Sequence, residues 1–332
     1  MIIVTGGAGF LGSAMVWKLN QEGLTDIVIV DDLGSGEKWK NLVNLRYNEY
    51  FHKEVFLELV ARDEIPWRVE AVVHMGACSS TTQTDAEYLM DNNYRYSRIL
   101  CEWCLDSGTR LINASSAATY GDGSLGFEDS VETMELLKPL NMYGYSKQLF
   151  DLWAHRAGAL GQIASLKFFN VFGPNEYHKG DMKSVICKAA AQIQETGKLE
   201  LFKSYKKEYP HGGQQRDFVY VKDCVDVMWW LINTPGANGL FNVGTGQART
   251  WNDLAEAVFA AMGLAPDIDY IDMPEAIRGK YQYFTQADTA RLKKAGCPVQ
   301  FMPLEQAVQD YVAKYLMAED PHLEMVEEIE LS

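Results

Sequence analysis

The chemistry available to this chain centres on Tyr143 and Lys147, in the segment Tyr-Gly-Tyr-Ser-Lys. Residues four apart lie on one face of a helix, so both side chains can touch one ligand if the segment opens a helix. A free phenol has a pKa of about 10, and making it a proton acceptor near neutral pH requires about 4 kcal/mol. An adjacent ammonium supplies part of that free energy. The pair is a candidate acid/base unit, although an idle surface pair would show the same spacing.

A glycine-rich turn, TGGAGFLG at 5–12, follows an apolar run and precedes a helix predicted to begin near Ser13. Its glycines permit a tight turn, a close approach of backbone to a pyrophosphate, and close packing of the helix on a sheet. Two aspartates end the next strand, where a carboxylate accepts a hydrogen bond from an adenosine ribose hydroxyl. The residues predicted to hold a dinucleotide here are Gly6, Gly9, Phe10, Leu11, Gly12, Asp31 and Asp32.

The aspartates alone would select NAD as the cofactor. Lys38 and Lys53 follow within reach of the same pocket, and either could pair with the 2′-phosphate of NADP; ordinary exposed lysines are the alternative.

Asn92 or Asn93 could anchor a loop or the cofactor, because asparagine is a poor helix former that bonds to backbone. Small residues at another strand end would let the backbone pass close to a flat ligand; the predicted cofactor contacts there are Met75, Gly76, Ala77, Cys78 and Ser79.

A serine-rich strand end, NASSAATYG at 113–121, delivers hydroxyl groups to the same cleft. Ser116 could hold a substrate hydroxyl and orient it toward a phenolate, although such a segment can also only cap backbone.

The glycine turn, Asp31, Ser116, Tyr143 and Lys147 together resemble the nucleotide-sugar epimerase and dehydratase group of the extended short-chain dehydrogenases/reductases. In that family the tyrosine is the acid/base, the lysine binds the nicotinamide ribose and lowers the tyrosine pKa, and the serine orients the sugar hydroxyl. The resemblance implies these roles for Tyr143, Lys147 and Ser116. Dehydratases of the group usually carry Asp-Glu after the serine position, whereas two alanines stand here, which favours an epimerase.

Further strings are similar to the branch of this group that epimerises C6 of ADP-activated heptoses: GACSSTT at 76–82, MDNNY at 90–94, ASSAATYG at 114–121, HKG at 178–180, RDFVYV at 216–221 and YQYFTQAD at 281–288. The resemblance implies tightly held NADP, with Lys38 and Lys53 on its 2′-phosphate. It implies that C6 is oxidised to a ketone and that the hydride returns to the opposite face. It also places Val171 and Lys179 beside the cofactor, and implies a homo-oligomer, expected to be a pentamer.

Lys179 has two interpretations. It could be a second acid/base, if burial or the positive nicotinamide ring lowers its pKa, or else a phosphate clamp or surface residue. The resemblance favours the first, with Tyr143 and Lys179 as the two acid/bases.

The substrate end departs from the family pattern. Asp181 stands where better-known members have a serine, and Lys188 where they have a histidine. The segment 202–215 is longer and is typical of a loop. Its three lysines, followed by an arginine, could clamp a diphosphate, and a solvated loop is the alternative. The predicted substrate contacts are Ser116, Asn170, Asp181, Lys188, Phe202, Lys203, Ser204, Tyr205, Arg216 and Tyr281.

The catalytic residues would be positioned by strands alternating with helices, which predicts an α/β fold with a Rossmann-type doubly wound parallel sheet. The alternation loosens after about residue 170, which predicts a smaller, mixed α/β C-terminal substrate lobe. The β-branched runs lie at 2–4, 27–30, 71–74, 111–114, 166–169, 218–221 and 240–243, and later helices are predicted at 182–194, 223–232, 251–262 and 304–317.

Three regions follow from this pattern. Residues 1–170, with strands at about 215–244, would form the NADP-binding domain. About 171–214 and 245–320 would form the substrate lobe, and 321–332 an acidic, solvated tail.

Bulk properties exclude some partners. A net charge of -15 argues against nucleic acid, which needs a basic face. The chain opens on a predicted strand and has no long apolar run, so we expect a cytoplasmic protein without membrane insertion. Cys101 and Cys104 lack a second ligand pair for zinc and fall late in a predicted helix, so we predict buried thiols and no metal.

Two other functions stay open: another nucleotide-sugar epimerase that acts like the UDP-sugar 4-epimerases, or a non-catalytic NAD(P)-binding module. Such modules typically lack the tyrosine or the lysine, and both are present here.

Overall fold

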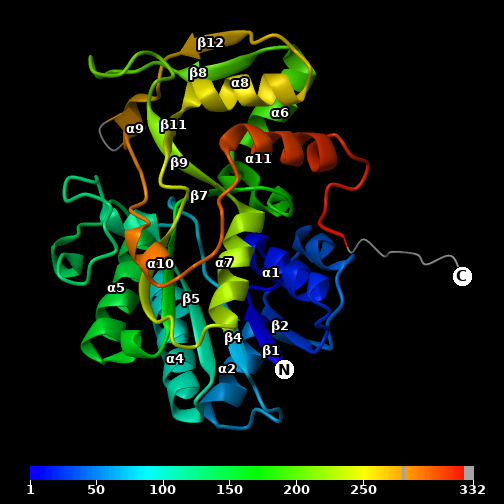
Figure 1. Cartoon of the computed structure of the whole chain (residues 1–332), viewed down its shortest axis with the longest axis vertical. Helices are drawn as coiled ribbons and strands as arrows, with labels where there is room; N and C mark the ends of the chain where they lie inside the picture. The colour runs from blue at the N-terminus through cyan, green and yellow to red at the C-terminus, as the bar shows by residue number, and fades with distance from the viewer. Residues whose placement is uncertain (279–280, 325–332) are drawn as a thin grey trace, which may run out of the picture.

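A seven-stranded parallel sheet forms the centre of the computed structural model, which describes residues 1–278 and 281–324 (Figure 1). The strand order is β10-β6-β5-β4-β1-β2-β3, and every neighbouring pair is parallel. The predicted Rossmann-type fold is thereby confirmed. The strands are β1 (Ile2–Thr5), β2 (Ile27–Asp31), β3 (Glu49–His52), β4 (Ala71–His74), β5 (Arg110–Ser116), β6 (Ala164–Phe168) and β10 (Gly239–Val243).

Helices cover both faces of this sheet. Successive side chains of a strand point to opposite faces, so each strand contributes to a core on either side. Ile2 and Val4 belong to one core, while Ile3 belongs to the other. The first core includes side chains of α1 (Phe10–Gln21) and α7 (Val221–Ile232). The second includes α2 (Lys53–Ala61), α4 (Tyr96–Ser107) and α5 (Met142–Arg156). Between α2 and α4 the chain forms α3 (Ala86–Leu89) and a π-helical turn, Met90–Arg95.

Two smaller sheets are formed by strands after residue 169, and β8, β9, β11 and β12 lie above the central sheet in Figure 1. One contains β7 (Asn170–Phe172), β9 (Gln215–Tyr220) and β11 (Ala248–Thr250), and the other contains β8 (Leu199–Phe202) and β12 (Ile268–Ile271). The remaining helices are α6 (Val185–Thr196), α8 (Trp251–Ala261), α9 (Glu275–Arg278), α10 (Ala290–Lys294) and α11 (Leu304–Tyr311).

The two strands predicted at about 215–244 for the NADP-binding domain lie in different sheets. β10 joins the central sheet, whereas β9 pairs with β7 and β11. The edge of β6 is occupied by β10 from Gly239 to Val243, so β9 has no free neighbour there. The division into two lobes near residue 170 stays a prediction.

Helix ends also differ from the sequence pattern. α1 begins at Phe10 rather than near Ser13, directly after an extended Gly9 whose position has no side-chain cap. α5 begins at Met142 because the Asn141 side chain accepts a hydrogen bond from the Gly144 amide at 2.8 Å. This cap places the tyrosine–lysine pair in the first two turns of the helix.

The described end of the chain is packed against the body of the protein rather than solvated. Leu323 is only 1% exposed, and its amide donates to Asn175 Oδ1 at 2.9 Å. Tyr177 donates to the Pro321 carbonyl at 2.7 Å, and Trp17 to the Glu324 carbonyl at 3.0 Å. The prediction of a solvated tail was therefore wrong for 321–324, because an apolar side chain and three backbone groups find partners there. Residues 325–332 lie outside the described part.

Cys101 and Cys104 are buried in α4 as free thiols, as predicted, and burial raises the pKa of both. Within residues 1–278 and 281–324, no helix combines the length and the apolarity that crossing a bilayer requires.

We expect Leu323→Ala to destabilise the protein by about 2–5 kcal/mol, because it leaves a cavity beneath the packed C-terminal segment. Urea unfolding measures the difference. Leu264→Ala is the matched control, since Leu264 is 47% exposed and its loss should change stability by less than about 0.5 kcal/mol. Equal effects of the two variants would contradict the packing described here.

Candidate active site

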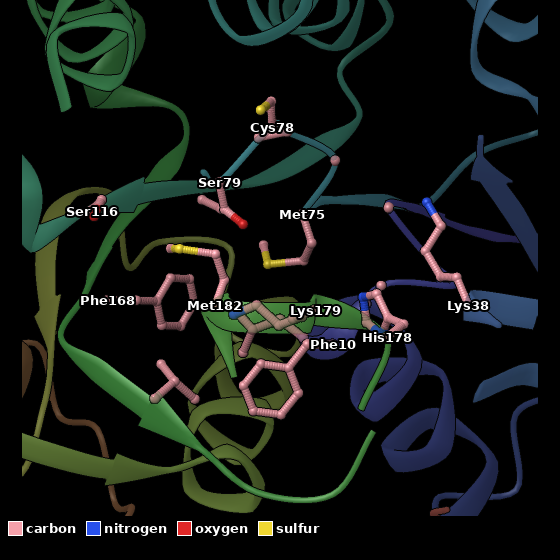
Figure 2. Close-up of a pocket in the computed structure, with 18 of the residues that line it drawn as sticks. Phe10, Lys38, Met75, Cys78, Ser79, Ser116, Phe168, His178, Lys179 and Met182 are labelled. Atoms are coloured by element: carbon pink, nitrogen blue, oxygen red, sulfur yellow. The ribbon is translucent and has the colours of Figure 1, made fainter. Parts of the chain in front are cut away.

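A cavity of about 780 Å³ opens at the carboxyl ends of the central strands. Every residue predicted to hold the dinucleotide lines it, from Gly6 in the turn after β1 to Lys179 in the loop after β7. Ser116, Tyr143 and Lys147 line the same cavity. In Figure 2, Ser116 and Lys38 lie on opposite sides of the view, with Lys179 between them. The fold therefore brings the predicted cofactor and catalytic residues together, while their individual roles stay predictions.

The glycine turn leaves room for backbone contacts that any side chain would block. Gly6 has a φ of +64°, and a Cβ there would lie 2.6 Å from the Gly76 nitrogen. A Cβ on Gly12 would lie 2.0 Å from the Gly6 carbonyl oxygen. α1 has no side-chain cap, and its first residues Phe10 and Leu11 line the cavity, so the free amides of a helix N-terminus are available there to bind an anion. The turn fits a dinucleotide pyrophosphate.

Two lysines stand at the far end of the cavity. Lys38 Nζ contacts Asp31 Oδ1 at 2.6 Å, and the other carboxylate oxygen accepts from the Ala8 amide at 2.8 Å. Lys53 Nζ donates to Asn92 Oδ1 at 2.8 Å. Both oxygens of Asp31 are therefore engaged inside the protein, and its charge is balanced by an ammonium group.

Tyr143 and Lys147 sit on α5 against β5. Lys147 is buried and donates to the Ala114 carbonyl at 2.7 Å. Burial lowers the pKa of Lys147 to about 8, while Asp151 raises it. Burial raises the pKa of Tyr143, and the hydrogen bond with Ser116 lowers it without reversing the shift. In the chain alone Tyr143 is a neutral phenol, so the phenolate predicted from the sequence needs a further positive charge.

Lys179 reaches the cavity from the 3₁₀ turn Tyr177–Met182. Its Nζ lies 5.3 Å from the centroid of the Phe10 ring, and both side chains are seen together in Figure 2. Burial lowers the pKa of Lys179, and the buried Glu176 carboxylate raises it. A partly desolvated ammonium of this kind can exchange a proton more readily than an exposed lysine.

Some of the predicted substrate contacts line the cavity and others lie outside its lining. Asn170 and Ser116 line the cavity. Lys188 instead donates to the Asp181 carbonyl at 2.5 Å, away from the cavity. The other predicted contacts also lie outside the lining that the described residues form: Phe202, Lys203, Ser204, Tyr205, Arg216 and Tyr281.

The cations of the predicted diphosphate clamp have separate partners. Lys203 contacts the exposed Asp272 at 3.3 Å, as Tyr205 does at 2.9 Å, and Lys206 Nζ lies 4.6 Å from the Tyr283 ring centroid. The Arg216 guanidinium lies 5.2 Å from the Tyr281 ring centroid and 5.8 Å from that of Trp251, which lines the cavity. The clamp stays a prediction.

Several lining residues were missed from the sequence: Tyr88, Phe169, His178, Met182 and Trp251. His178 directly precedes Lys179, and that position was the available signal. Burial lowers the pKa of His178 to about 4, and Lys38 adds to this effect, so the imidazole is neutral. The aromatic and Met positions carried no signal, because apolar residues in a sequence more often fill a core than line a ligand site.

The chain resembles known proteins along nearly its whole length. A curated relative from Nitratidesulfovibrio vulgaris, named ADP-L-glycero-D-manno-heptose-6-epimerase, is 67% identical and covers 97% of this chain and 100% of its own length. A relative of the same name from Fusobacterium nucleatum is 47% identical over the same shares. The crystal structure of the Helicobacter pylori enzyme of that name superposes with a TM-score of 0.79 at 26% identity, over 94% of this chain and 95% of that one.

The sequence pattern of a family described as "NAD dependent epimerase/dehydratase family" matches residues 2–244. The matched range contains the glycine turn, Ser116, Tyr143, Lys147 and Lys179. The fold, the cavity and the names of the relatives all agree with an epimerase of nucleotide sugars. The protein therefore belongs to the NAD dependent epimerase/dehydratase family.

Proposed function

We propose that this epimerase interconverts ADP-D-glycero-D-manno-heptose and ADP-L-glycero-D-manno-heptose at C6, with NADP as its cofactor. C6 is oxidised to a ketone and re-reduced on the opposite face. The names of the relatives at 67% and 47% identity support the substrate. The observation that carries the proposal is that Lys179, whose pKa is lowered by burial, lines the same cavity as Tyr143 and could serve as a second proton-exchanging group.

In this proposal, Ser116 orients the C6 hydroxyl and Tyr143 takes its proton, while Lys147 binds the nicotinamide ribose. Bound NADP⁺ would supply a hydride acceptor for C6 and a positive charge that would favour the Tyr143 phenolate. Lys179 exchanges the proton for the opposite C6 configuration, so each epimer has its own acid/base. Asn170, which lines the cavity, would contact the sugar.

NADP rather than NAD is supported by the adenosine end of the cavity. In NAD enzymes the strand-end carboxylate accepts from the ribose hydroxyl, but here the Lys38 ammonium already occupies one oxygen of Asp31. Lys38 and Lys53 together present two cations where a 2′-phosphate would lie, and charge-assisted bonds to phosphate are among the stronger polar contacts.

We further propose a cytoplasmic homo-oligomer, with a pentamer as the expected form from the family resemblance. Light scattering on the purified protein tests the assembly directly.

The competing function is epimerisation of a UDP-sugar at C4. A UDP-N-acetylglucosamine 4-epimerase from Methanobrevibacter ruminantium shares the fold with a TM-score of 0.76 at 25% identity, over 94% of this chain. Because the two chains share this fold, UDP-sugars are the appropriate comparison substrates.

Incubation with ADP-D-glycero-D-manno-heptose and NADP⁺ should yield the C6 epimer without net reduction of the cofactor, as followed by NMR. Tyr143→Phe and Lys179→Met should each reduce kcat by about 10²–10⁴, because each removes one acid/base. Tyr145→Phe is the matched control, since this neighbouring phenol is 43% exposed and does not line the cavity. Turnover of UDP-galactose in place of the heptose would overturn the proposed substrate.

The double change Lys38→Ala with Lys53→Ala should weaken NADP binding by about 10²–10⁴, since each charge-assisted bond contributes about 1.5–3 kcal/mol net. NAD affinity should fall far less. Calorimetric titration measures both, and Lys198→Ala serves as the control because Lys198 is exposed and pairs with Asp269. If NAD bound as tightly as NADP, and the variant left both affinities unchanged, the 2′-phosphate assignment would be wrong.

A further inference from the structure

Asp151 is a fully buried carboxylate that lies one helical turn after Lys147 on α5 and does not line the cavity. Ser115 Oγ donates to its Oδ2 at 2.5 Å, and Ser165 Oγ donates to its Oδ1 at 2.9 Å. Asn113 Nδ2 in turn donates to Ser165 Oγ at 2.9 Å. Both carboxylate oxygens are thus engaged by hydroxyl groups on neighbouring central strands.

These bonds join the helix and the strand that carry the proposed catalytic groups. Ser115 belongs to β5 and directly precedes Ser116. α5 carries both Tyr143 and Lys147, and Lys147 makes a second tie to β5 through the Ala114 carbonyl. A shift of α5 along β5 would therefore have to break the Asp151 bonds as well as the Lys147 bond. Small displacements matter at such sites, where about 1 Å of misplacement can cost about a hundredfold in rate.

The carboxylate also balances buried positive charge. Lys167 on β6 is only 1% exposed, and its Nζ lies 4.3 Å from the Tyr120 ring centroid. Burial raises the pKa of Asp151 above its ordinary value, and Lys167, the two serine hydroxyls and Lys147 reduce this shift without reversing it. Two buried lysines and two hydroxyl donors facing one carboxyl group favour its ionised form. An unpaired buried charge would be strongly destabilising.

The other charged or titratable groups near this cluster come from three elements. His74 on β4 faces Lys147, and burial lowers its pKa to about 3, so it is neutral. Asp129, in the loop before α5, acts on Lys167. Tyr143 on α5 is a neutral phenol in the chain alone. Asp151 is therefore the anion that acts on Lys147 directly.

We propose that Asp151 is a positioning residue of this epimerase, which fixes α5 against the strand that carries Ser116 and keeps the Lys147 ammonium charged for the cofactor and the phenolate. The inference rests on the proposed roles of Tyr143 and Lys147. It assigns a function to a buried charge that the proposed proton transfers do not use.

The charge role has a definite sign. Lys147 is needed as an ammonium, and that form is lost as the pH rises through its folded-state pKa. Burial lowers this pKa to about 8, and Asp151 opposes the shift. Removing the carboxylate must therefore lower the pKa further and move the alkaline limb of activity and NADP⁺ affinity to lower pH.

The experiment measures NADP⁺ affinity by calorimetry, and turnover where it occurs, from pH about 6 to about 10 in the full-length protein. Asp151→Asn keeps the shape and removes the charge, and it should shift the alkaline limb down by about one unit, a tenfold loss at a fixed pH on that limb. Lys147→Met identifies the limb, which should disappear in that variant. Asp223→Asn is the matched control, a buried carboxylate on α7 that accepts from the Met302 amide and lies outside the cavity.

An Asp151→Asn profile that coincides with wild type would overturn the charge role, even if the variant were less stable. If Asp151→Asn does not fold, Asp151→Ser is the second neutral replacement. It should move the limb down as well, and a limb that stays in place or moves up contradicts the proposal. The clamping role is tested by Ser165→Ala, which removes one of the two hydroxyl bonds to Asp151 at a residue outside the cavity lining and should lower kcat. Unchanged kcat would overturn it. The affinity profiles remain informative if the wild type fails to turn over the heptose, so failure of the proposed function is distinguishable.

Discussion

The backbone contact between Gly6 and Gly76 is the constraint on which the cavity depends. It lies where β1 meets β4, the point in the strand order at which successive connections leave in opposite directions and a crevice opens. A single added Cβ on Gly6 would come within 2.6 Å of the Gly76 nitrogen, so the two strand ends could not approach as they do. The turn into α1, the Asp31 strand end and the Ser116 strand end all border this crevice.

Around that crevice, the protein buries lysines beside carboxylates. Lys147 has Asp151 on its own helix, and Lys179 has Glu176 three residues earlier in its loop. In both cases burial lowers the lysine pKa and the carboxylate opposes it. The balance leaves each ammonium easier to deprotonate than an exposed lysine while retaining a partner for its charge, which suits groups that hold or move protons next to a cofactor.

The loop that carries Lys179 is held by segments distant in the sequence. Glu176 accepts from Ser184 Oγ at 2.6 Å and from Tyr311 of α11 at 3.0 Å. Asn175 donates to Ser13 Oγ on α1 at 2.9 Å and accepts from the amide of Leu323. Helix α1, helix α11 and the end of the described chain therefore all contact this loop. Its geometry depends on long-range contacts rather than on the local HKG string.

The sequence by itself determined the parallel sheet, the glycine turn and the pairing of Tyr143 with Lys147, because these depend on short-range periodicity and on backbone freedom at fixed spacings. It also placed Asp31 and Ser116 at strand ends, where parallel strands converge. Only the tertiary structure decided that β9 leaves the central sheet, that 321–324 pack on the body, and that Lys203 and Tyr205 turn to Asp272. Only the tertiary structure showed that Asp151 acts on Lys147 and that Glu176 acts on Lys179. Which buried charge faces which depends on contacts between segments far apart in the chain, and no local spacing encodes them.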